Sequence, residues 1–360
     1  MKYFSGTVYR DGKFSEGFIG VEDGVIKKTG RGACPKPLAK GVIVPTFINA
    51  HTHIGDSAVN IDPKPTDSFM ELVAPPNSLK HRMLASMPES EIVGGMRISI
   101  KTILSSGVSS FVDFREGGVC GVGMMRKALK GSPVCGIALG RPDKMEYHGN
   151  EIEEILDNSD GIGASSVLDW DYGELEKLSK HTHRKGKIFA LHANERVRED
   201  IDKILDLKPS FLVHMNEATD ADLARCADAG VPVAICPRSN IFFGKVPDIP
   251  KFIRNGVTLM LGTDNAMISR PDFFRELETA YRIGRLKGGV GASEILRLAI
   301  ENPRKTLRAL MDTGISENER ASFIVLDLPG NNAGFALLAH ATARDISHIQ
   351  MGKWSWRLRA

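Results

Sequence analysis

The sequence predicts an α/β fold: a (β/α)8 TIM barrel with a small discontinuous β-sandwich-like domain built from both chain ends. Three observations lead to this prediction. Short apolar strands alternate with amphipathic helical stretches through the middle of the chain, which is typical of a parallel sheet. About eight such strands follow one another, as a (β/α)8 barrel requires. Both chain ends carry short alternating segments that are too small to be stable alone.

The first 41 residues differ in texture from the rest of the chain. Short alternating runs are broken at Asp11-Gly12 and Asp23-Gly24, and Asp-Gly between such runs indicates a β-hairpin. We therefore expect two or three antiparallel strands in this part.

The other end of the chain has the same character. Residues 321–328 and the last residues read as strands. We expect them to pair with the first strands, so that residues 1–41 and 318–360 form the small domain. Residues 42–317 then form the barrel.

The barrel strands are expected in apolar, β-branched segments. These segments are 42–50, 108–114, 134–140, 161–167, 187–192, 210–215, 231–236 and 257–263. Helical patterns cover 89–105, 150–158, 173–185, 219–229, 246–255, 272–287 and 293–311. A doubly wound open sheet is the alternative, but it normally shows a glycine-rich turn after its first strand. Here His51-Thr52-His53 stands in that position.

The composition is that of an ordinary globular protein. The 360 residues are 42% hydrophobic and 25% charged with a formal net charge of +3, so no nucleic-acid partner is indicated. No apolar run reaches the roughly 18 residues that a membrane span needs. The N-terminus lacks the apolar stretch of a signal peptide, and the five scattered cysteines form no Cys-x-x-Cys pair. We expect a reduced, cytoplasmic protein.

Titratable side chains stand at the carboxyl ends of several predicted strands. His51 and His53 follow the first strand, His192 ends the fifth, His214 the sixth, and Asp264 the eighth. Residues two apart on a strand point the same way, so His51 and His53 can reach one point. Barrel active sites lie at these strand ends, and imidazole is a common ligand of zinc and iron. The pattern therefore indicates a metal site.

As a set, these motifs resemble those of the amidohydrolase superfamily. The resemblance covers nearly the whole chain and includes FINAHTH, HANE, the strand-six histidine, CPRSN and GTDN. In this superfamily the His-x-His pair, the strand-five histidine and the strand-eight aspartate bind one catalytic metal. The resemblance implies the corresponding ligands here: His51, His53, His192 and Asp264. Thr46 departs from the common motif, which has glycine before Phe-Ile-Asn, and this departure concerns packing.

Further features resemble the mononuclear deaminase branch. The predicted fourth strand, GIGASSVLDW, contains no lysine that could bridge two metals as a carboxylated side chain. Glu195, three residues after the strand-five histidine, resembles the proton-transferring glutamate of the purine, pyrimidine and related aminohydrolases. CPRSN, from Cys236 to Asn240, resembles the same branch. The expected cofactor is one divalent transition metal, with zinc first and iron or manganese as alternatives.

The expected reaction is hydrolytic deamination of an aminated heterocycle or nucleoside-like substrate. A metal held by three imidazoles and a carboxylate leaves room for a water molecule and lowers its pKa. Asp264 and His214 can accept or hold the proton of that water. Glu195 can donate a proton to the ring nitrogen beside the attacked carbon, so that ammonia is released. A simpler role for Glu195 is to stabilise free N–H groups at a helix start.

Two other functions stay open. One is hydrolysis of a cyclic amide C–N bond, as in imidazolonepropionase-like relatives, which would open a ring without releasing ammonia. The other is a non-enzymatic scaffold that keeps only the fold.

Side chains beyond the strand ends give clues to the small-molecule substrate. Arg115, Arg141 and Arg238 follow predicted strands, and Asn240 lies in the same motif as Arg238. Guanidinium groups suit bidentate recognition of carboxylate or phosphate, so we expect these four residues to bind a substrate with an anionic group or an oxygen-rich heterocycle. The alternative is that the arginines pair with neighbours such as Glu116. The oligomeric state stays open, a homo-oligomer included.

Overall fold

The computed structural model describes residues 1–32, 34, 36–64, 67–75, 77–307 and 314–357. Its named strands form two sheets, one with nine strands and one with seven. By its contacts the chain divides into two compact units. The first contains residues 1–49, 103–110 and 272–360, and the second contains residues 50–102 and 111–271.

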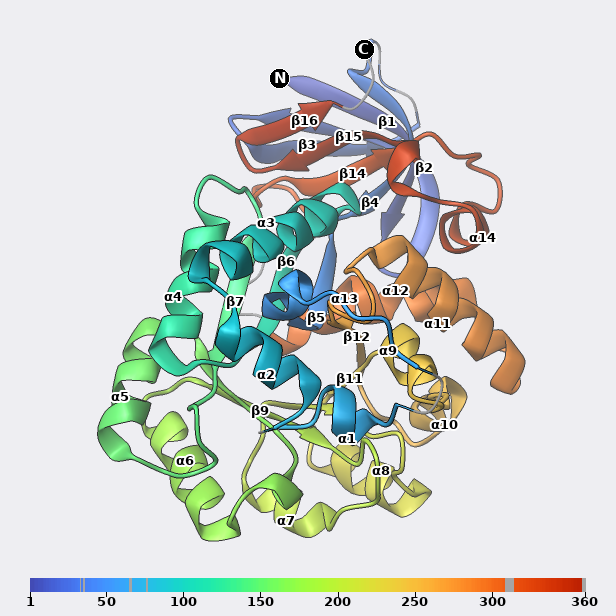
Figure 1. The fold of residues 1–360 in the computed structure, drawn as a ribbon. Helices are drawn as coiled ribbons and strands as arrows, with labels where there is room; N and C mark the ends of the chain where they lie inside the picture. The colour runs from blue at the N-terminus through green and yellow to red at the C-terminus, as the bar shows by residue number, and fades with distance from the viewer. Residues whose placement is uncertain (33, 35, 65–66, 76, 308–313, 358–360) are drawn as a thin grey trace. The chain divides into compact units, whose positions relative to one another are not determined.

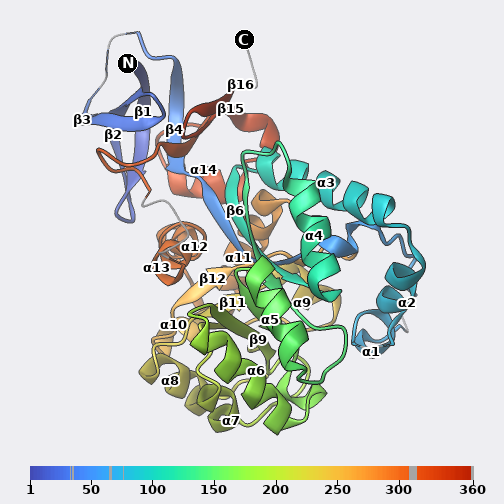
Figure 2. The same cartoon turned by 90° about the vertical axis from the view of Figure 1, so that its left-hand side faces the viewer.

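The seven-stranded sheet combines strands from both ends of the chain, as Figure 2 shows in blue and red. Its order is β16-β15-β14-β4-β1-β2-β3, and β1 and β4 are parallel while the other pairs are antiparallel. Its strands are β1 (Lys2–Arg10), β2 (Lys13–Glu22), β3 (Val25–Arg31), β4 (Ala39–Pro45), β14 (Ser322–Leu326), β15 (Ile346–Met351) and β16 (Trp354–Arg357). A core that includes Phe4, Ile19, Ile26, Ile43 and Phe323 is fully buried on it.

Two tight turns join β1 to β2 and β2 to β3. Asp11 and Gly12 have φ values of 49° and 77°, and Asp23 and Gly24 have φ values of 50° and 79°. Left-handed backbone at both central residues matches the twist of the paired strands, and Asp-Gly adopts it readily. The two Asp-Gly pairs therefore explain why the chain reverses where it does.

The predicted strand 42–50 is wrong as one element. The chain changes sheets at Thr46, because β4 ends at Pro45 and β5 begins at Phe47. The Thr46 N–H donates to the Ser322 carbonyl oxygen (3.2 Å) within the first unit, and the next N–H, from Phe47, donates to Gly107 (2.9 Å). One apolar run thus serves two sheets, and β5 continues to His53.

The nine-stranded sheet is parallel and curls back toward its own first strand. Its order is β12-β11-β10-β9-β8-β7-β6-β5-β13, and its recorded pairings are parallel. Its strands are β5 (Phe47–His53), β6 (Val108–Arg115), β7 (Cys135–Gly140), β8 (Gly161–Ala164), β9 (Ile188–Ala193), β10 (Phe211–His214), β11 (Val233–Ile235), β12 (Leu259–Leu261) and β13 (Asp264–Asn265). Sequence and structure therefore agree on an α/β fold with a curled parallel sheet.

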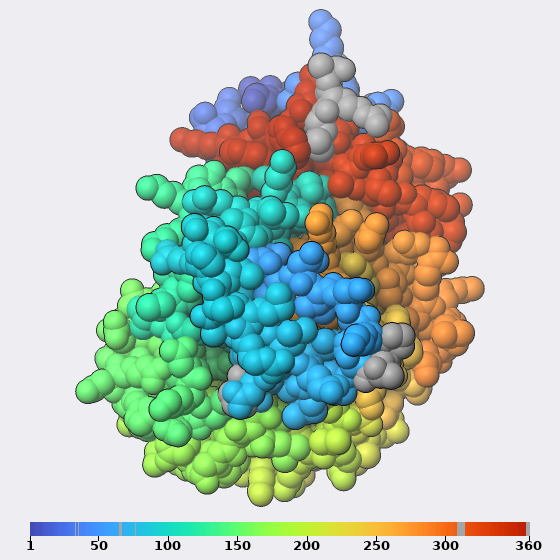
Figure 3. Space-filling model, in the orientation of Figure 1, coloured from blue at the N-terminus to red at the C-terminus, as the bar shows by residue number. Residues whose placement is uncertain are grey.

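Helices alternate with these strands, and Figure 1 shows α5 to α8 around the outside of the strands. They are α3 (Glu89–Ser105), α4 (Gly118–Leu129), α5 (Gly149–Asn158), α6 (Tyr172–Arg184), α7 (Ile201–Asp206), α8 (Asp220–Asp228), α9 (Pro237–Phe242) and α10 (Ile249–Arg254). Two short helices, α1 (Phe69–Leu72) and α2 (Leu79–Ser86), follow β5. The segment that carries them, blue to cyan in Figure 3, covers the middle of the face shown.

The first unit also contains α11 (Phe273–Gly288), α12 (Ala292–Ala299), α13 (Glu301–Thr306) and α14 (Ala333–Ala339). The predicted helix 293–311 is wrong as one element, because α12 and α13 are separated at Ile300, and residues 308–311 lie outside the described residues. Across the described ranges, no helix is both long enough and apolar enough to cross a membrane.

Candidate active site

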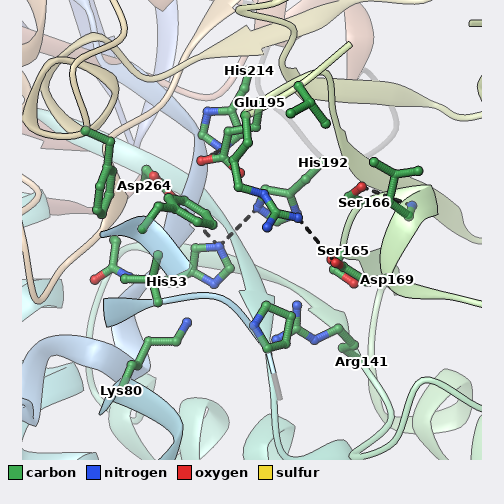
Figure 4. A pocket seen from close by; sticks show the side chains of 18 of the residues that line it. His53, Lys80, Arg141, Ser165, Ser166, Asp169, His192, Glu195, His214 and Asp264 are labelled. Atoms are coloured by element: carbon green, nitrogen blue, oxygen red, sulfur yellow. Dashed lines mark hydrogen bonds and ion pairs between the residues drawn. The ribbon is translucent and has the colours of Figure 1, made fainter. Parts of the chain in front are cut away.

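Four strands of the parallel sheet bring the predicted site residues together at one edge. His51 and His53 lie at the end of β5, His192 in β9, His214 at the end of β10, and Asp264 at the start of β13. All four strands belong to the same parallel sheet, in which β9 is next to β10 and β5 is next to β13. The site residues therefore share one edge of the sheet. Figure 4 shows the side chains of His53, His192, His214 and Asp264 pointing toward one another.

Three imidazoles and one carboxylate converge on a common point. His51 Nε2 lies 3.1 Å from Asp264 Oδ1, and His53 Nε2 lies 3.3 Å from His192 Nε2. One ligand atom from each of the four side chains lies within 4.8 Å of the others. Atoms bound to one zinc ion at about 2.0 to 2.2 Å have mutual distances in this range. These four residues therefore form a cluster that fits one metal ion.

The chemical state of the histidines also suits a metal. His192 Nδ1 donates to the Ala164 carbonyl oxygen (3.0 Å), which leaves the lone pair of Nε2 toward the cluster. Burial lowers the pKa of His53 well below its ordinary value, and the nearby Lys80 charge lowers it further. Burial likewise lowers the pKa of His192. Neutral imidazole is the form that binds metals.

Asp264 is held from both sides. The Ser239 hydroxyl donates to Asp264 Oδ2 (2.5 Å), while Oδ1 faces His51 and His53. Burial raises the pKa of Asp264, but the hydrogen bond to His51 and the neighbouring imidazoles lower it more, so that the net pKa lies well below its usual value. Asp264 is therefore a carboxylate with one oxygen directed at the cluster.

A second group of side chains borders the cluster. His214 Nε2 lies 3.4 Å from Glu195 Oε1, and one ligand atom each of Glu195, His214 and Asp264 lies within 4.8 Å of the others. Asn240 Nδ2 donates to His214 Nδ1 (3.0 Å). Burial raises the pKa of Glu195 well above its ordinary value, and the charge of Asp264 raises it further. A protonated carboxyl beside a metal site is able to donate its proton.

Residues 42–350 match the model of the amidohydrolase family. This chain belongs to the amidohydrolase family. It is 33% identical over 335 residues to an uncharacterised protein of Methanocaldococcus jannaschii, and the match covers 84% of this chain and 85% of that protein. A 5-methylthioadenosine/S-adenosylhomocysteine deaminase of Haloarcula marismortui is 25% identical over 346 residues, which cover 83% of this chain and 76% of that protein.

A solved structure shows the same fold. An adenosine deaminase of Xanthomonas campestris with bound zinc superposes on this chain with a TM-score of 0.81 at 18% identity. The match covers 98% of this chain and 92% of the deaminase. Membership of this family identifies the chain as a hydrolytic enzyme, as the sequence motifs indicated.

Four residues in or beside the candidate site of this amidohydrolase have left-handed backbone. Asn194, His214, Met215 and Asp264 have φ values of 47°, 76°, 56° and 58°. Left-handed backbone is costly for residues other than glycine, and such strain gathers at functional sites. Here His214 and Asp264, whose side chains face the cluster, occupy such backbone positions.

The predicted substrate residues are placed differently from one another. Arg141 lines the pocket over the cluster, together with His53, His192, Glu195, His214 and Asp264. The described lining of that pocket does not include Arg115, Arg238 or Asn240. Arg238 donates to the Arg270 carbonyl oxygen (2.9 Å), and Asn240 contacts His214. The role of all four in substrate binding stays a prediction.

A buried ion network lies beside the pocket, and of its carboxylates sequence reasoning named only Glu116, as an alternative partner of the arginines. Lys80 Nζ lies 2.8 Å from Glu116 Oε1 and 3.2 Å from Asp56 Oδ2. Arg141 lies 2.6 Å from Glu116, and Arg115 lies 3.2 Å from the other oxygen of Glu116. Two signals in the sequence were available: Asp56 follows His53 by three residues, and Glu116 directly follows a strand end.

The loop that carries Glu195 is fixed from two sides. Asn194 and Glu199 form reciprocal hydrogen bonds between backbone N–H groups and side-chain oxygens, and Ser166 donates to Glu199. On the outer side, Arg198 makes two bonds of 2.8 Å to Asp222 on α8. These contacts hold the turn that directs Glu195 toward His214.

The Arg198–Asp222 ion pair predicts a stability that depends on pH. The hydrogen bond from Arg198 lowers the pKa of Asp222, so its stabilisation is present above the unfolded pKa of about 3.9 and is lost as the pH falls below it. Asp222→Asn should lower the free energy of unfolding by about 1 kcal/mol at pH 7. The loss is small because Arg198 is exposed, so that solvent screens the ion pair. The loss should shrink at pH 3 in urea denaturation.

Asp220→Asn is the matched control, because Asp220 lies in the first turn of the same helix and is exposed. An Asp222→Asn loss of the same size at both pH values would contradict the role given to the ionised carboxylate.

Proposed function

We propose that this chain is a mononuclear, metal-dependent aminohydrolase that removes an amino group from a heterocycle by hydrolysis, with release of ammonia. The observation that carries this proposal is the convergence of His51, His53, His192 and Asp264 beside Glu195 and His214. All of these residues except His51 line the same pocket. The first set suits a metal, and the second set suits proton transfer.

The metal would be held by His51, His53, His192 and Asp264. Nitrogen and oxygen ligands without thiolate suit zinc, and also iron or manganese, and the zinc in the similar adenosine deaminase favours zinc. A bound metal of this kind activates water at neutral pH and polarises the attacked bond.

A single metal is supported by the surroundings of His53. His53, Asp56 and Glu116 form a further group with metal-like spacing. The Lys80 ammonium, however, lies 3.2 Å from Asp56 and 2.8 Å from Glu116, and it already supplies positive charge there. Strand β8, Gly161–Ala164, contains no lysine that could bridge two metals.

The other residues would divide the proton transfers. Asp264 accepts a proton from the attacking water, and Glu195 delivers one to the heterocycle. His214 accepts a hydrogen bond from Asn240 at Nδ1, so the proton of its neutral ring is on Nε2, toward Glu195. His214 therefore orients the reacting groups, and Asn240 fixes its tautomer.

The finer architecture belongs to the same proposal. β12 pairs with β11 and β13 pairs with β5, and only Gly262 and Thr263 separate β12 from β13. We propose that these two segments are one eighth strand that closes a (β/α)8 barrel. The division into residues 1–41 with 318–360 and residues 42–317, the sandwich-like character of the smaller part, a cytoplasmic location and homo-oligomer formation stay predictions.

The substrate class is proposed from the relatives together with the pocket. The similar proteins from H. marismortui and X. campestris are named as deaminases of adenosine-type nucleosides. We therefore propose an aminated purine nucleoside. A suitable panel is adenosine, its 5′-methylthio derivative and its 5′-phosphate, with aminated pyrimidines and pterins beside them.

Metal removal tests the proposal. Protein dialysed against a chelator should release no ammonia from the panel, and about one equivalent of zinc per chain should restore release. Turnover by the metal-free protein would contradict the proposal. Ring opening without ammonia would instead support hydrolysis of a cyclic C–N bond.

A further inference from the structure

Lys80 is a buried cation that lies against the candidate metal site. Its side chain comes from α2 and extends toward His53, as Figure 4 shows. Lys80 is 3% exposed and lines the pocket together with His53 and Glu116. Burial alone would lower the pKa of Lys80, but the charges of Asp56 and Glu116 raise it more, so that the net pKa lies above its ordinary value. Lys80 is therefore an ammonium ion held inside the protein.

The side chains around this ammonium have the spacing of metal ligands. One ligand atom each of His53, Asp56 and Glu116 lies within 4.8 Å of the others. His53 Nε2 lies 3.3 Å from His192 and 3.6 Å from Asp264, inside the four-residue cluster. The other ring nitrogen, Nδ1, lies 3.8 Å from Glu116 Oε1. Three protein ligands and a water molecule are enough for a zinc ion, so this second group has the composition of a metal site of its own.

Two of these three side chains have buried polar atoms that make no hydrogen bond. Among the described residues, His53 Nδ1 and both carboxylate oxygens of Asp56 have no hydrogen-bond partner. His53 is 5% exposed and Asp56 is 0% exposed. Their recorded contacts are ion pairs, from His53 Nδ1 to Glu116 and from Asp56 Oδ2 to Lys80. Buried polar atoms of this kind are uncommon, and an ion is one of the few partners that satisfies them.

Lys80 Nζ occupies the position that such an ion would take. It lies 2.8 Å from Glu116 Oε1 and 3.2 Å from Asp56 Oδ2, so that it bridges the two carboxylates. The ammonium of lysine is a compact charge, and a divalent ion beside it would meet a like charge at short distance. A metal ion and Lys80 Nζ therefore exclude each other from this position.

The charge balance of the ion network gives Lys80 the same role. The recorded ion pairs join three cations to three carboxylates, namely Lys80, Arg115, Arg141, Asp56, Asp113 and Glu116. Within the described part of the chain, the recorded partner of Asp56 is Lys80. Removal of Lys80 would leave this buried carboxylate without a cation, which is costly. A divalent ion in the same position would supply the lost positive charge.

We propose that His53, Asp56 and Glu116 form a second cation site, which Lys80 occupies with its ammonium in place of a metal ion. The protein binds one metal ion because this side chain takes the second position. Without Lys80, a divalent ion would bind at Nδ1 of His53 and at the two carboxylates. This inference rests on the proposed metal site and deepens it, since it assigns the number of bound metal ions to one residue of α2.

The metal content of Lys80 variants tests this inference. The natural protein and Lys80→Ala are dialysed against the same excess of free zinc, and the bound zinc is measured by atomic spectroscopy. The natural protein should bind about one zinc ion per chain and Lys80→Ala about two, because alanine removes the charge and leaves room for the ion. Lys80→Gln removes the charge but keeps a hydrogen-bond donor for the carboxylates, which favours folding, and it should also bind about two.

Two further variants locate the second ion. Arg82→Ala removes an exposed charge from the same helix and should bind about one zinc ion, as the natural protein does. The double variant Lys80→Ala/Asp56→Asn lacks one of the three ligands and should return to about one. Excess zinc should also raise the free energy of unfolding of Lys80→Ala more than that of the natural protein, because the second ion binds the folded chain alone.

The outcomes separate this inference from the proposed function. One zinc ion per chain in the natural protein, Lys80→Ala and Lys80→Gln alike would overturn the inference and leave the aminohydrolase proposal standing. A second ion that persists in the double variant would do the same, because it would lie elsewhere. Two ions in the natural protein would overturn both the role of Lys80 and the single-metal proposal. A natural protein that binds no zinc would overturn the proposed metal site, on which the inference rests.

Discussion

Replacing Glu195 by glutamine is expected to lower turnover by about 100-fold to 10,000-fold. Glu195 lies 3.4 Å from His214 and borders the proposed metal site without being one of the four proposed ligands. Glutamine keeps the shape of the side chain and cannot deliver a proton. The variant should therefore bind metal as the natural protein does, and it should lose kcat with little change in KM.

The measurement is steady-state ammonia release together with metal content by atomic spectroscopy. Glu217→Gln is the matched control, because Glu217 pairs with Lys245 (2.7 Å) in a partly exposed position outside the pocket. Full activity in Glu195→Gln would reduce Glu195 to a structural role, and loss of the metal would make it a support of the ligands.

Replacing Lys80 by methionine is expected to destabilise the fold by about 3 to 5 kcal/mol, the usual result of removing one partner from a buried ion pair. Lys80 is 3% exposed and Asp56 is 0% exposed. Burial raises the pKa of Asp56 to about 7, against the opposing charge of Lys80. Without Lys80, the folded protein would contain the buried Asp56 carboxyl without the cation that pairs with it.

Chemical denaturation of the two proteins at the same pH gives this difference. Arg82→Met, on the same helix and exposed, is the matched control and should change the free energy of unfolding by less than about 0.5 kcal/mol. A similarly small effect of Lys80→Met would mean that the network is not a source of stability.

The sequence was sufficient to predict that these four side chains lie together, because strand ends are local features. His51 and His53 follow a β-branched run, and His192 and Asp264 end similar runs. In a parallel sheet, the carboxyl ends of the strands necessarily meet. The positions of these residues therefore required only the strand assignments and not the details of packing.

The ion network was not predictable in the same way. Lys80, Asp56 and Glu116 come from three segments, and their distances depend on how α2 packs over the strand ends. A sequence shows an arginine or lysine near a strand end, but it does not show which carboxylate meets it. The cations were therefore expected either to bind a substrate or to pair with neighbours such as Glu116, and the structure shows Arg115 and Arg141 paired with Glu116.

The break at Thr46 has a similar cause. Residues 42–50 are continuously apolar and read as one strand. The Thr46 hydroxyl bonds to Ser109 and Ser322 (both 2.7 Å), residues far away in the chain. These distant partners decide where β4 ends and β5 begins, and local propensity contains no information about them.

The central claim is that one metal ion is bound at the strand ends, and X-ray diffraction at the zinc absorption edge tests it most directly. A crystal of the zinc-loaded protein should show one anomalous peak, about 2.0 to 2.2 Å from Nε2 of each histidine and from a carboxylate oxygen. The residues concerned are His51, His53, His192 and Asp264. Two peaks, or a peak bound by other residues, would contradict the account.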